Sequence, residues 1–162
     1  MKTAYQAPGV WESFGTHSMA LVVGEGRQVL VGGQVAWDER RHVVGVGDMR
    51  AQARQTLLNI QAFLTAVGGE MDDVVSIVTY VTRSEGLRDI HEVRREFFSP
   101  PYPVSTLVQV AALVDPDLLI EVTATAVVPE ERYRAPAPLK PAVSGFSDGG
   151  FNLGNTVEVK GE

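Results

Sequence analysis

The sequence predicts an α+β domain in which two amphipathic helices back one sheet. The clearest evidence is the stretch from Asp48 to Thr82, which reads as a complete helix followed by a complete strand. Its first half places apolar residues three or four positions apart, on one helical face: Ala53, Leu57, Ile60, Leu64 and Val67. Its second half, residues 74–82, is rich in β-branched residues and has no helical stripe. A second apolar stripe and further β-rich runs flank this unit.

The N-terminal third predicts two strands. Residues 1–15 are polar and contain glycine, so we expect an irregular lead-in. Residues 18–23 and 28–35 are β-rich and are joined by a glycine turn at 24–26, which predicts a hairpin. The paired glycines Gly32 and Gly33 mark either a bulge or a place where a ligand or another backbone comes close. A short edge strand is expected at residues 42–44.

The first helix has clear boundaries. Asp48 is expected to be its N-cap, and Gly68 with Gly69 ends it, because glycine readily takes the left-handed conformation that closes a helix.

The strand that follows this helix is apolar on both faces. Strict alternation puts Val75, Ile77 and Val81 on one side and Val74, Val78 and Tyr80 on the other. The helices can cover only one side, so we expect another subunit to bury the other.

The second helix carries Leu87, Ile90, Val93 and Phe97 at helical spacing, with Ser84 as its expected cap and the prolines at 100–103 as its end. Two strands follow, at residues 104–111 and 118–128, joined by a turn at 115–117. The predicted order is β-β-α-β-α-β-β. In the last strand Glu121 points away from an apolar face, and a carboxylate in mid-strand must be solvated, paired or functional.

The chain divides into a domain at residues 1–128 and a proline- and glycine-rich extension at 129–162. Five apolar residues of the extension are expected to dock it on the body or on a neighbour: Tyr133, Leu139, Phe146, Phe151 and Leu153. The one candidate for a regular element in the extension is a short strand at 156–159. Residues 145–149 match G-x-S-x-G, but their context is not the strand, turn and helix that a nucleophile elbow requires.

Composition excludes several functions. A net charge of −6 and scattered basic residues disfavour nucleic-acid binding. The absence of cysteine excludes disulfides, thiolate nucleophiles and thiolate metal sites. The three histidines lack metal-ligand spacing, so no metal site is expected. No signal core or membrane-spanning run is visible, and a cytoplasmic, membrane-independent protein is expected.

Several short segments together resemble the RidA/YjgF family of imine and enamine deaminases. They are residues 32–34, 52–55 with Leu58-Asn59, the strand 74–82, Phe97-Phe98, and Ile120-Glu121-Val122 with Ala124 and Ala126. The resemblance covers roughly residues 15–128. It implies a chorismate-mutase-like fold, a homotrimer with a site in each cleft between subunits, and imine hydrolysis by water without a cofactor.

The resemblance also implies site residues. Glu121 matches the glutamate that positions the water, and Gly33 matches the glycine whose backbone completes the cleft. Ser105 stands where the family has the arginine that grips the substrate carboxylate, so little hydrolysis of small 2-imino acids is expected. His17 replaces a pocket tyrosine, His91 an asparagine of the second helix, and Leu107 a frequent cysteine.

Two functions remain open. In the first, Glu121, His17 and His91 perform acid-base chemistry on a small imine, enamine or carbonyl compound, while Gly33, Ser105 and Leu107 bind it. In the second, the same clefts bind a metabolite or a protein partner without catalysis. Convergence of His17, His91 and Glu121 across a subunit boundary would favour the first.

Overall fold

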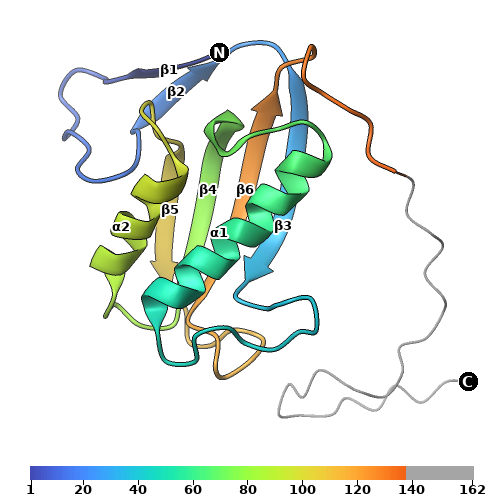
Figure 1. Ribbon diagram of the computed structural model, residues 1–162. Helices are drawn as coiled ribbons and strands as arrows, with labels where there is room; N and C mark the ends of the chain where they lie inside the picture. The colour runs from blue at the N-terminus through green and yellow to red at the C-terminus, as the bar shows by residue number, and fades with distance from the viewer. Residues whose placement is uncertain (138–162) are drawn as a thin grey trace, which may run out of the picture.

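The computed structural model describes residues 1–137 and shows two helices on the same side of a four-stranded sheet (Figure 1). The helices are α1 (Met49–Ala66) and α2 (Leu87–Phe97). The sheet contains β3 (Arg27–Val35), β4 (Val74–Val81), β5 (Val104–Gln109) and β6 (Ile120–Val128), in the order β3-β6-β4-β5. β4 and β5 run parallel, whereas the other neighbours are antiparallel. The predicted α+β class, with two helices backing a sheet, is confirmed.

The N-terminal region differs from the prediction. Residues 2–5 are not irregular: they form β1 (Lys2–Tyr5), which pairs with β2 (Ala20–Val23) in a separate two-stranded sheet. The predicted hairpin is therefore wrong, because β3 pairs with β6 and not with β2. The glycine turn reverses the chain, as its residues indicate. A turn does not specify which strands pair, however, and β3 lies against the apolar β6, which is distant in the sequence.

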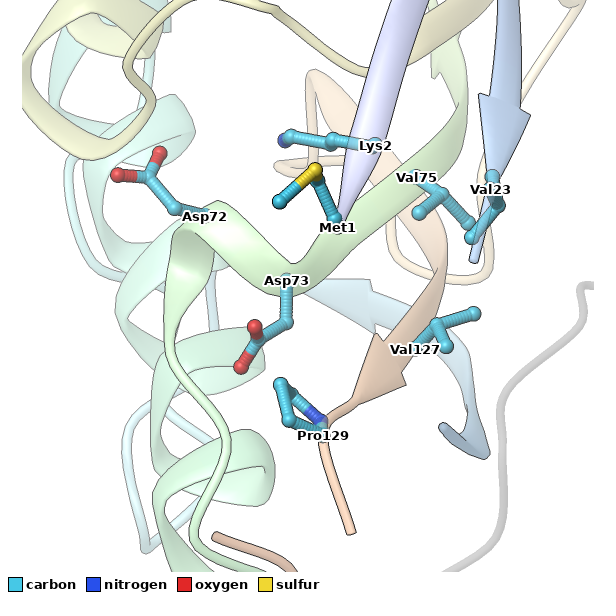
Figure 2. Close-up of a pocket in the computed structure, with 8 residues that line it drawn as sticks. All are labelled: Met1, Lys2, Val23, Asp72, Asp73, Val75, Val127 and Pro129. Carbon is cyan, nitrogen blue, oxygen red and sulfur yellow. The ribbon is translucent and has the colours of Figure 1, made fainter. Parts of the chain in front are cut away.

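β1 and β2 lie close to one end of the main sheet. Lys2 Nζ donates a hydrogen bond of 3.0 Å to the carbonyl oxygen of Val74. A small pocket of about 50 Å³ lies at this junction, and Figure 2 shows the side chains that line it: Met1, Lys2, Val23, Asp72, Asp73, Val75, Val127 and Pro129. Burial lowers the pKa of Lys2, and the two carboxylates oppose that shift. The N-terminal strands therefore cover a small part of the sheet face that the helices leave free.

The core lies between the helices and the sheet. On β6 every second residue is buried against the helices, as the apolar pattern predicts: Ile120, Val122, Ala124, Ala126 and Val128. From α1, Leu57, Ile60 and Leu64 fill the same layer. Both predicted ends of α1 are confirmed, since Asp48 accepts a 3.0 Å hydrogen bond from the Ala51 amide and Gly68 has a φ of 77°. No helix in residues 1–137 is long and apolar enough to cross a membrane.

β4 begins with an irregularity that strict alternation does not anticipate. The β4–β6 register shifts between Val74 and Ser76. As a result Val74 is fully buried in the core with Ile77 and Val81, whereas Val75 is only half-buried. The predicted faces are therefore wrong for Val74 and Val75, which exchange sides, and correct for the rest of the strand.

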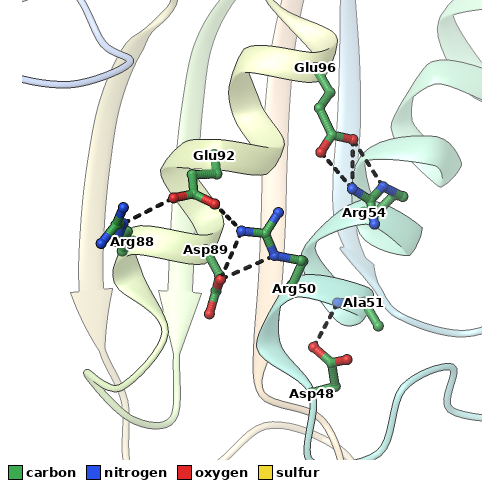
Figure 3. Close-up of polar contacts among 8 residues, drawn as sticks. All are labelled: Asp48, Arg50, Ala51, Arg54, Arg88, Asp89, Glu92 and Glu96. Atoms are coloured by element: carbon green, nitrogen blue, oxygen red, sulfur yellow. Dashed lines mark hydrogen bonds and ion pairs between the residues drawn. The ribbon is translucent and has the colours of Figure 1, made fainter.

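Ion pairs join α2 to α1 (Figure 3). Arg50 of α1 pairs with Asp89 and Glu92 of α2, and Arg54 pairs with Glu96. The predicted cap of α2 is wrong: Gly86, with a φ of 92°, precedes Leu87, and the Ser84 side chain makes no cap. Gly86 fits because Met49 packs closely over it, at 2.7 Å from the position of an added Cβ.

Two side-chain amides of α1, the buried Gln52 and the half-buried Asn59, hold the loops at the end of the sheet where β3 finishes. Gln52 Nε2 donates to the carbonyl oxygens of Gly45 and Asp117, and its Oε1 accepts from the Leu119 amide at 2.7 Å. Asn59 Nδ2 donates to the carbonyl oxygens of Val35 and Trp37. Gln52 and Asn59 belong to the segments that carry the family resemblance, and their contacts are structural.

The chain continues past β6 along the body. The Arg134 amide donates to the carbonyl oxygen of Val67 at 2.9 Å, Arg132 pairs with Asp73, and Arg27 lies 4.9 Å from the centre of the Tyr133 ring. Several expectations concern residues that lie outside the described part of the chain: the anchors Leu139, Phe146, Phe151 and Leu153, the candidate strand at 156–159 and the G-x-S-x-G match at 145–149.

Candidate functional site

His17 and His91 come together beside the start of β5. The segment before β2 runs along this strand, since the Ser18 amide donates to the Pro103 carbonyl oxygen at 3.0 Å. Next to it, Thr16 meets the imidazole of His91, which projects from α2, with 2.9 Å between Thr16 Oγ1 and Nδ1. The Thr16 amide also donates to Nδ1 at 3.4 Å, which makes Nδ1 an acceptor and leaves the proton of the neutral ring on Nε2.

Both imidazoles favour the neutral form. Burial lowers the pKa of His17, and the nearby charge of Arg94 lowers it further. Burial also lowers the pKa of His91, with smaller contributions from Arg94, His17 and Arg95. In the neutral form His17 has one acceptor nitrogen, whereas His91, whose Nδ1 is held by Thr16, presents an Nε2–H donor.

Gly15 allows this arrangement. Its φ is 85°, and a Cβ there would stand 3.0 Å from Cε1 and 3.1 Å from Nδ1 of His91. The backbone before Thr16 therefore lies flat against the ring, in a conformation that residues with a side chain rarely adopt.

Ser105 lies next to a guanidinium that sequence reasoning missed. Arg94 of α2 is only 3% exposed, and its Nη2 donates to Thr79 Oγ1 at 2.7 Å. Its Nη1 donates to Ser105 Oγ at 3.3 Å. Burial lowers the pKa of Arg94 to about 10, so it carries its charge at neutral pH. A guanidinium from α2 thus reaches position 105, where the resemblance leads one to expect an arginine on the strand itself.

A pocket of about 220 Å³ opens beside Ser105 and His17. It is lined by Trp11, His17, Ser18, Met19, Ser76, Val104, Ser105 and Thr106. Phe14 contacts the His17 ring edge-on, with 5.9 Å between ring centres. Hydroxyl groups and an imidazole thus face a volume large enough for a small metabolite.

Glu121 lies elsewhere. It pairs with Tyr80 of β4 and Val35 of β3, on the sheet face opposite the helices. An added Cβ at Gly33 would overlap Oε1 of Glu121 and stand 2.9 Å from its Cδ. The paired glycines coincide with a register shift between Val31 and Gln34, so the bulge, one of the two alternatives predicted there, is confirmed.

Within one chain the predicted site residues form two groups. Ser105 pairs with Ile77 and faces the helices, as its bond to Arg94 shows, and Leu107 follows two residues later, on the same face as Thr79. Tyr80 of β4 pairs with Glu121 of β6 on one side and with Val108 of β5 on the other. Glu121 therefore lies two strand spacings across the sheet from Val108, and Val108 lies three residues along β5 from Ser105. The Cα atoms of Glu121 and Ser105 are thus roughly 14 Å apart. His17 and His91 are close to Ser105 and far from Glu121, and the carboxylate and the imidazoles do not converge in a single chain.

Comparison with known proteins identifies the family. Residues 11–128 match the family model for Endoribonuclease L-PSP. A RutC family protein of Pyrococcus horikoshii is 32% identical over 112 residues, which cover 69% of this chain and 86% of the relative. A 2-iminobutanoate/2-iminopropanoate deaminase of Dermatophagoides farinae is 30% identical over the same length and the same shares of both chains.

Solved structures agree with these sequence matches. A Rid family protein of unknown function from Yersinia pestis has a TM-score of 0.69 and 29% identity, covering 78% of this chain and 98% of that one. RidA from a Psychrobacter species has a TM-score of 0.58 and 31% identity, covering 78% and 99%. The family model, the sequence relatives and these structures all point to the same conclusion: the chain belongs to the RidA/YjgF family.

Proposed function

We propose that this protein hydrolyses a small imine or enamine, or catalyses a related acid-base step on a carbonyl compound, without a cofactor. The observation that carries the proposal is the pair of neutral imidazoles, His17 and His91, beside a polar pocket of metabolite size. The deaminase among its relatives supports an imine as the substrate.

The chemistry requires proton transfers that these residues can perform. A carboxylate takes a proton from water while the water oxygen bonds to the imine carbon, and the imine nitrogen is protonated. The resulting carbinolamine expels ammonia and leaves a carbonyl group. Glu121 is proposed as the base, and His17 with His91 as the groups that pass protons to nitrogen. Gly33, Ser105 and Leu107 are proposed to contact the substrate.

We propose further that each site is shared by two chains of a homotrimer. The separation of Glu121 from the imidazoles within one chain supports this arrangement, since a neighbour could bring the two groups together. The sheet face that carries Glu121 also exposes apolar side chains in one chain: Leu30, opposite Thr125, is 74% exposed, and Val108, opposite Tyr80, is 39% exposed. Burying such residues against another subunit is favourable.

The alternative is a non-catalytic protein that binds a metabolite or a protein partner. The serine at position 105 favours it, because a hydroxyl is a poorer carboxylate ligand than a guanidinium on the same strand. Cleavage of RNA, which the name Endoribonuclease L-PSP suggests for members of the family, is disfavoured by the net charge of −6.

The test is a coupled assay in which an amino-acid oxidase generates the imine from alanine, and the rate of pyruvate formation is followed with and without the protein. Because Ser105 replaces the arginine, we expect only weak hydrolysis of this 2-imino acid, above the spontaneous rate but at least about tenfold slower than in a family member that keeps the arginine. Glu121→Gln should lower the turnover of any imine that the protein hydrolyses by about 10²- to 10⁴-fold. The matched control is Thr125→Ser, on the same face of β6. If the turnover of Glu121→Gln stays within about threefold of the wild-type value, Glu121 is not the base. If no small imine is hydrolysed, the binding alternative is favoured.

A further inference from the structure

Thr16 directs two hydrogen-bond donors at one nitrogen of His91. Its Oγ1 lies 2.9 Å from Nδ1, and its backbone amide donates to the same nitrogen at 3.4 Å. A hydroxyl can turn and accept a hydrogen bond instead, but an amide N–H can only donate. A proton on Nδ1 would therefore face the proton of the amide. Both the other tautomer of the ring and its charged form are thus disfavoured.

The backbone that supplies this amide is held in place. Thr16 is only 1% exposed, and two residues later the Ser18 amide donates to the Pro103 carbonyl oxygen at 3.0 Å. Gly15 lies against the same imidazole, since a Cβ there would stand 3.0 Å from Cε1 of His91. The ring therefore cannot move away from the amide on the side of Gly15, and the amide cannot move away from the ring.

The opposite nitrogen of His91 stays open. Nε2 has no hydrogen-bond partner in residues 1–137, and it is not among the buried polar atoms of this part of the chain that lack one. It is therefore accessible to a ligand. Burial, the largest cause, lowers the pKa of His91, and the charges of Arg94, His17 and Arg95 act in the same direction. These surroundings add to the effect of the Thr16 amide, so the accessible group is an Nε2–H donor of an uncharged ring.

We propose that Gly15 and Thr16 are positioning residues that hold His91 as a neutral ring, whose Nε2–H donates a hydrogen bond to the substrate while His17 alone passes protons. A neutral ring that released its Nε2 proton would become an anion unless Nδ1 took up another proton, and the Thr16 amide opposes that uptake. A fixed donor stabilises the charge that develops on nitrogen or oxygen when water adds to a C=N or C=O bond, and it keeps its own proton. The inference rests on the proposed function and narrows the part that His91 plays in it.

The first test observes the ring directly and needs no substrate. Nitrogen NMR of the isotopically labelled full-length protein distinguishes a protonated from an unprotonated ring nitrogen, and loss of a signal in His91→Asn assigns it among the three histidines. We expect a protonated Nε2 and an unprotonated Nδ1 at about pH 7, and a titration midpoint below the ordinary value of about 6.5.

Gly15→Ala should release the ring. Its Cβ would stand 3.0 Å from Cε1 and 3.1 Å from Nδ1 of His91, so the imidazole must turn away from the Thr16 amide. We expect a mixture of tautomers and a midpoint nearer to the ordinary value. Gly9→Ala is the matched control. The φ of Gly9, 77°, is as unfavourable for alanine as the 85° of Gly15, but no atom of the described chain lies within 4 Å of the added Cβ.

The second test separates a hydrogen-bond donor from a proton carrier in the imine assay. Asparagine has an N–H donor but does not titrate, whereas leucine has similar bulk and no donor. We expect His91→Asn to keep its turnover within about tenfold of wild type, and His91→Leu to lose about 10²-fold or more, as when one donor to a developing charge is removed. His17→Asn should lose turnover although it keeps a donor, because His17 is the proton carrier.

Three results would each overturn the inference: a wild-type ring that is charged or protonated on Nδ1 at about pH 7, an unchanged ring in a folded Gly15→Ala variant, or equal losses in His91→Asn and His91→Leu. If Gly15→Ala fails to fold, the wild-type spectrum and the two His91 variants still decide. A neutral ring with Nε2–H that Gly15→Ala releases, in a protein that hydrolyses no imine, would uphold the positioning role and refute the proposed function. Hydrolysis with equal losses in the two His91 variants would do the reverse.

Discussion

Replacing Gly33 with alanine should move Glu121 while leaving the fold intact. The new Cβ would overlap Oε1 and lie 2.9 Å from Cδ and 3.3 Å from Cγ of Glu121. Ordinary contact begins at 3.4 Å, so Cδ must retreat by about 0.5 Å and Oε1 by more. The atoms in conflict are the end of a flexible side chain, so the carboxylate, and not the backbone, should yield.

The two consequences have different magnitudes. Alanine in place of glycine stabilises a compatible backbone by about 0.4 to 1 kcal/mol, and an off-rotamer glutamate costs about 0.5 to 1.5 kcal/mol. The net change in unfolding free energy should stay within about 1 kcal/mol. A base displaced by up to about 1 Å, however, should lower turnover by about 10- to 100-fold.

Gly32→Ala is the matched control, because no atom lies within 4 Å of the Cβ that it adds. Urea unfolding and the coupled imine assay should be run on both variants. We expect both to fold, only Gly33→Ala to lose activity, and Gly33→Ala combined with Glu121→Gln to be no slower than Glu121→Gln alone. Full activity in Gly33→Ala would refute the role of Glu121 as base, and equal losses in the two alanine variants would refute the steric reasoning.

Two further predictions concern pH and assembly. His17 and His91 have a lower pKa in the folded chain than the ordinary 6.5, so the unfolded chain binds more protons and stability should decline as pH falls below about 6.5. Urea midpoints at about pH 7.5 and about pH 5.5 measure this, and His91→Asn should flatten the dependence; a midpoint that rises on acidification would contradict it. Sedimentation equilibrium should give about three times the mass of one chain, whereas a stable monomer at micromolar concentration would exclude the trimer.

Residues with strong local signals were predictable from sequence. Asp48 and Gly68 mark the two ends of α1 as expected, and the alternation of residues in β6 correctly identified its buried face. The errors have physical causes. The irregularity at the start of β4 exchanges the sheet faces on which Val74 and Val75 lie, and no residue type in this segment predicts it. The pairing of β2 with β1 is a non-local choice between strands, which a glycine turn does not determine.

The candidate site was harder to predict, because its geometry depends on distant segments. The sequence singled out Ser105, His17 and His91, and the structure brings these together with Arg94. Arg94 did leave a signal: it stands four residues after Ile90 and three before Phe97, on the apolar stripe of α2. A lone charge on a buried stripe calls for a search for its partner.

A shared catalytic site is the central claim, and mixed oligomers test it most directly. Glu121→Gln and His17→Asn chains, each inactive alone, should be dissociated, mixed in equal amounts and reassembled. A site built from Glu121 of one chain and His17 of its neighbour is intact in about one quarter of the interfaces, so about one quarter of wild-type turnover should return. If mass spectrometry shows that the chains have exchanged and no activity returns, Glu121 and His17 do not serve one site across a subunit boundary.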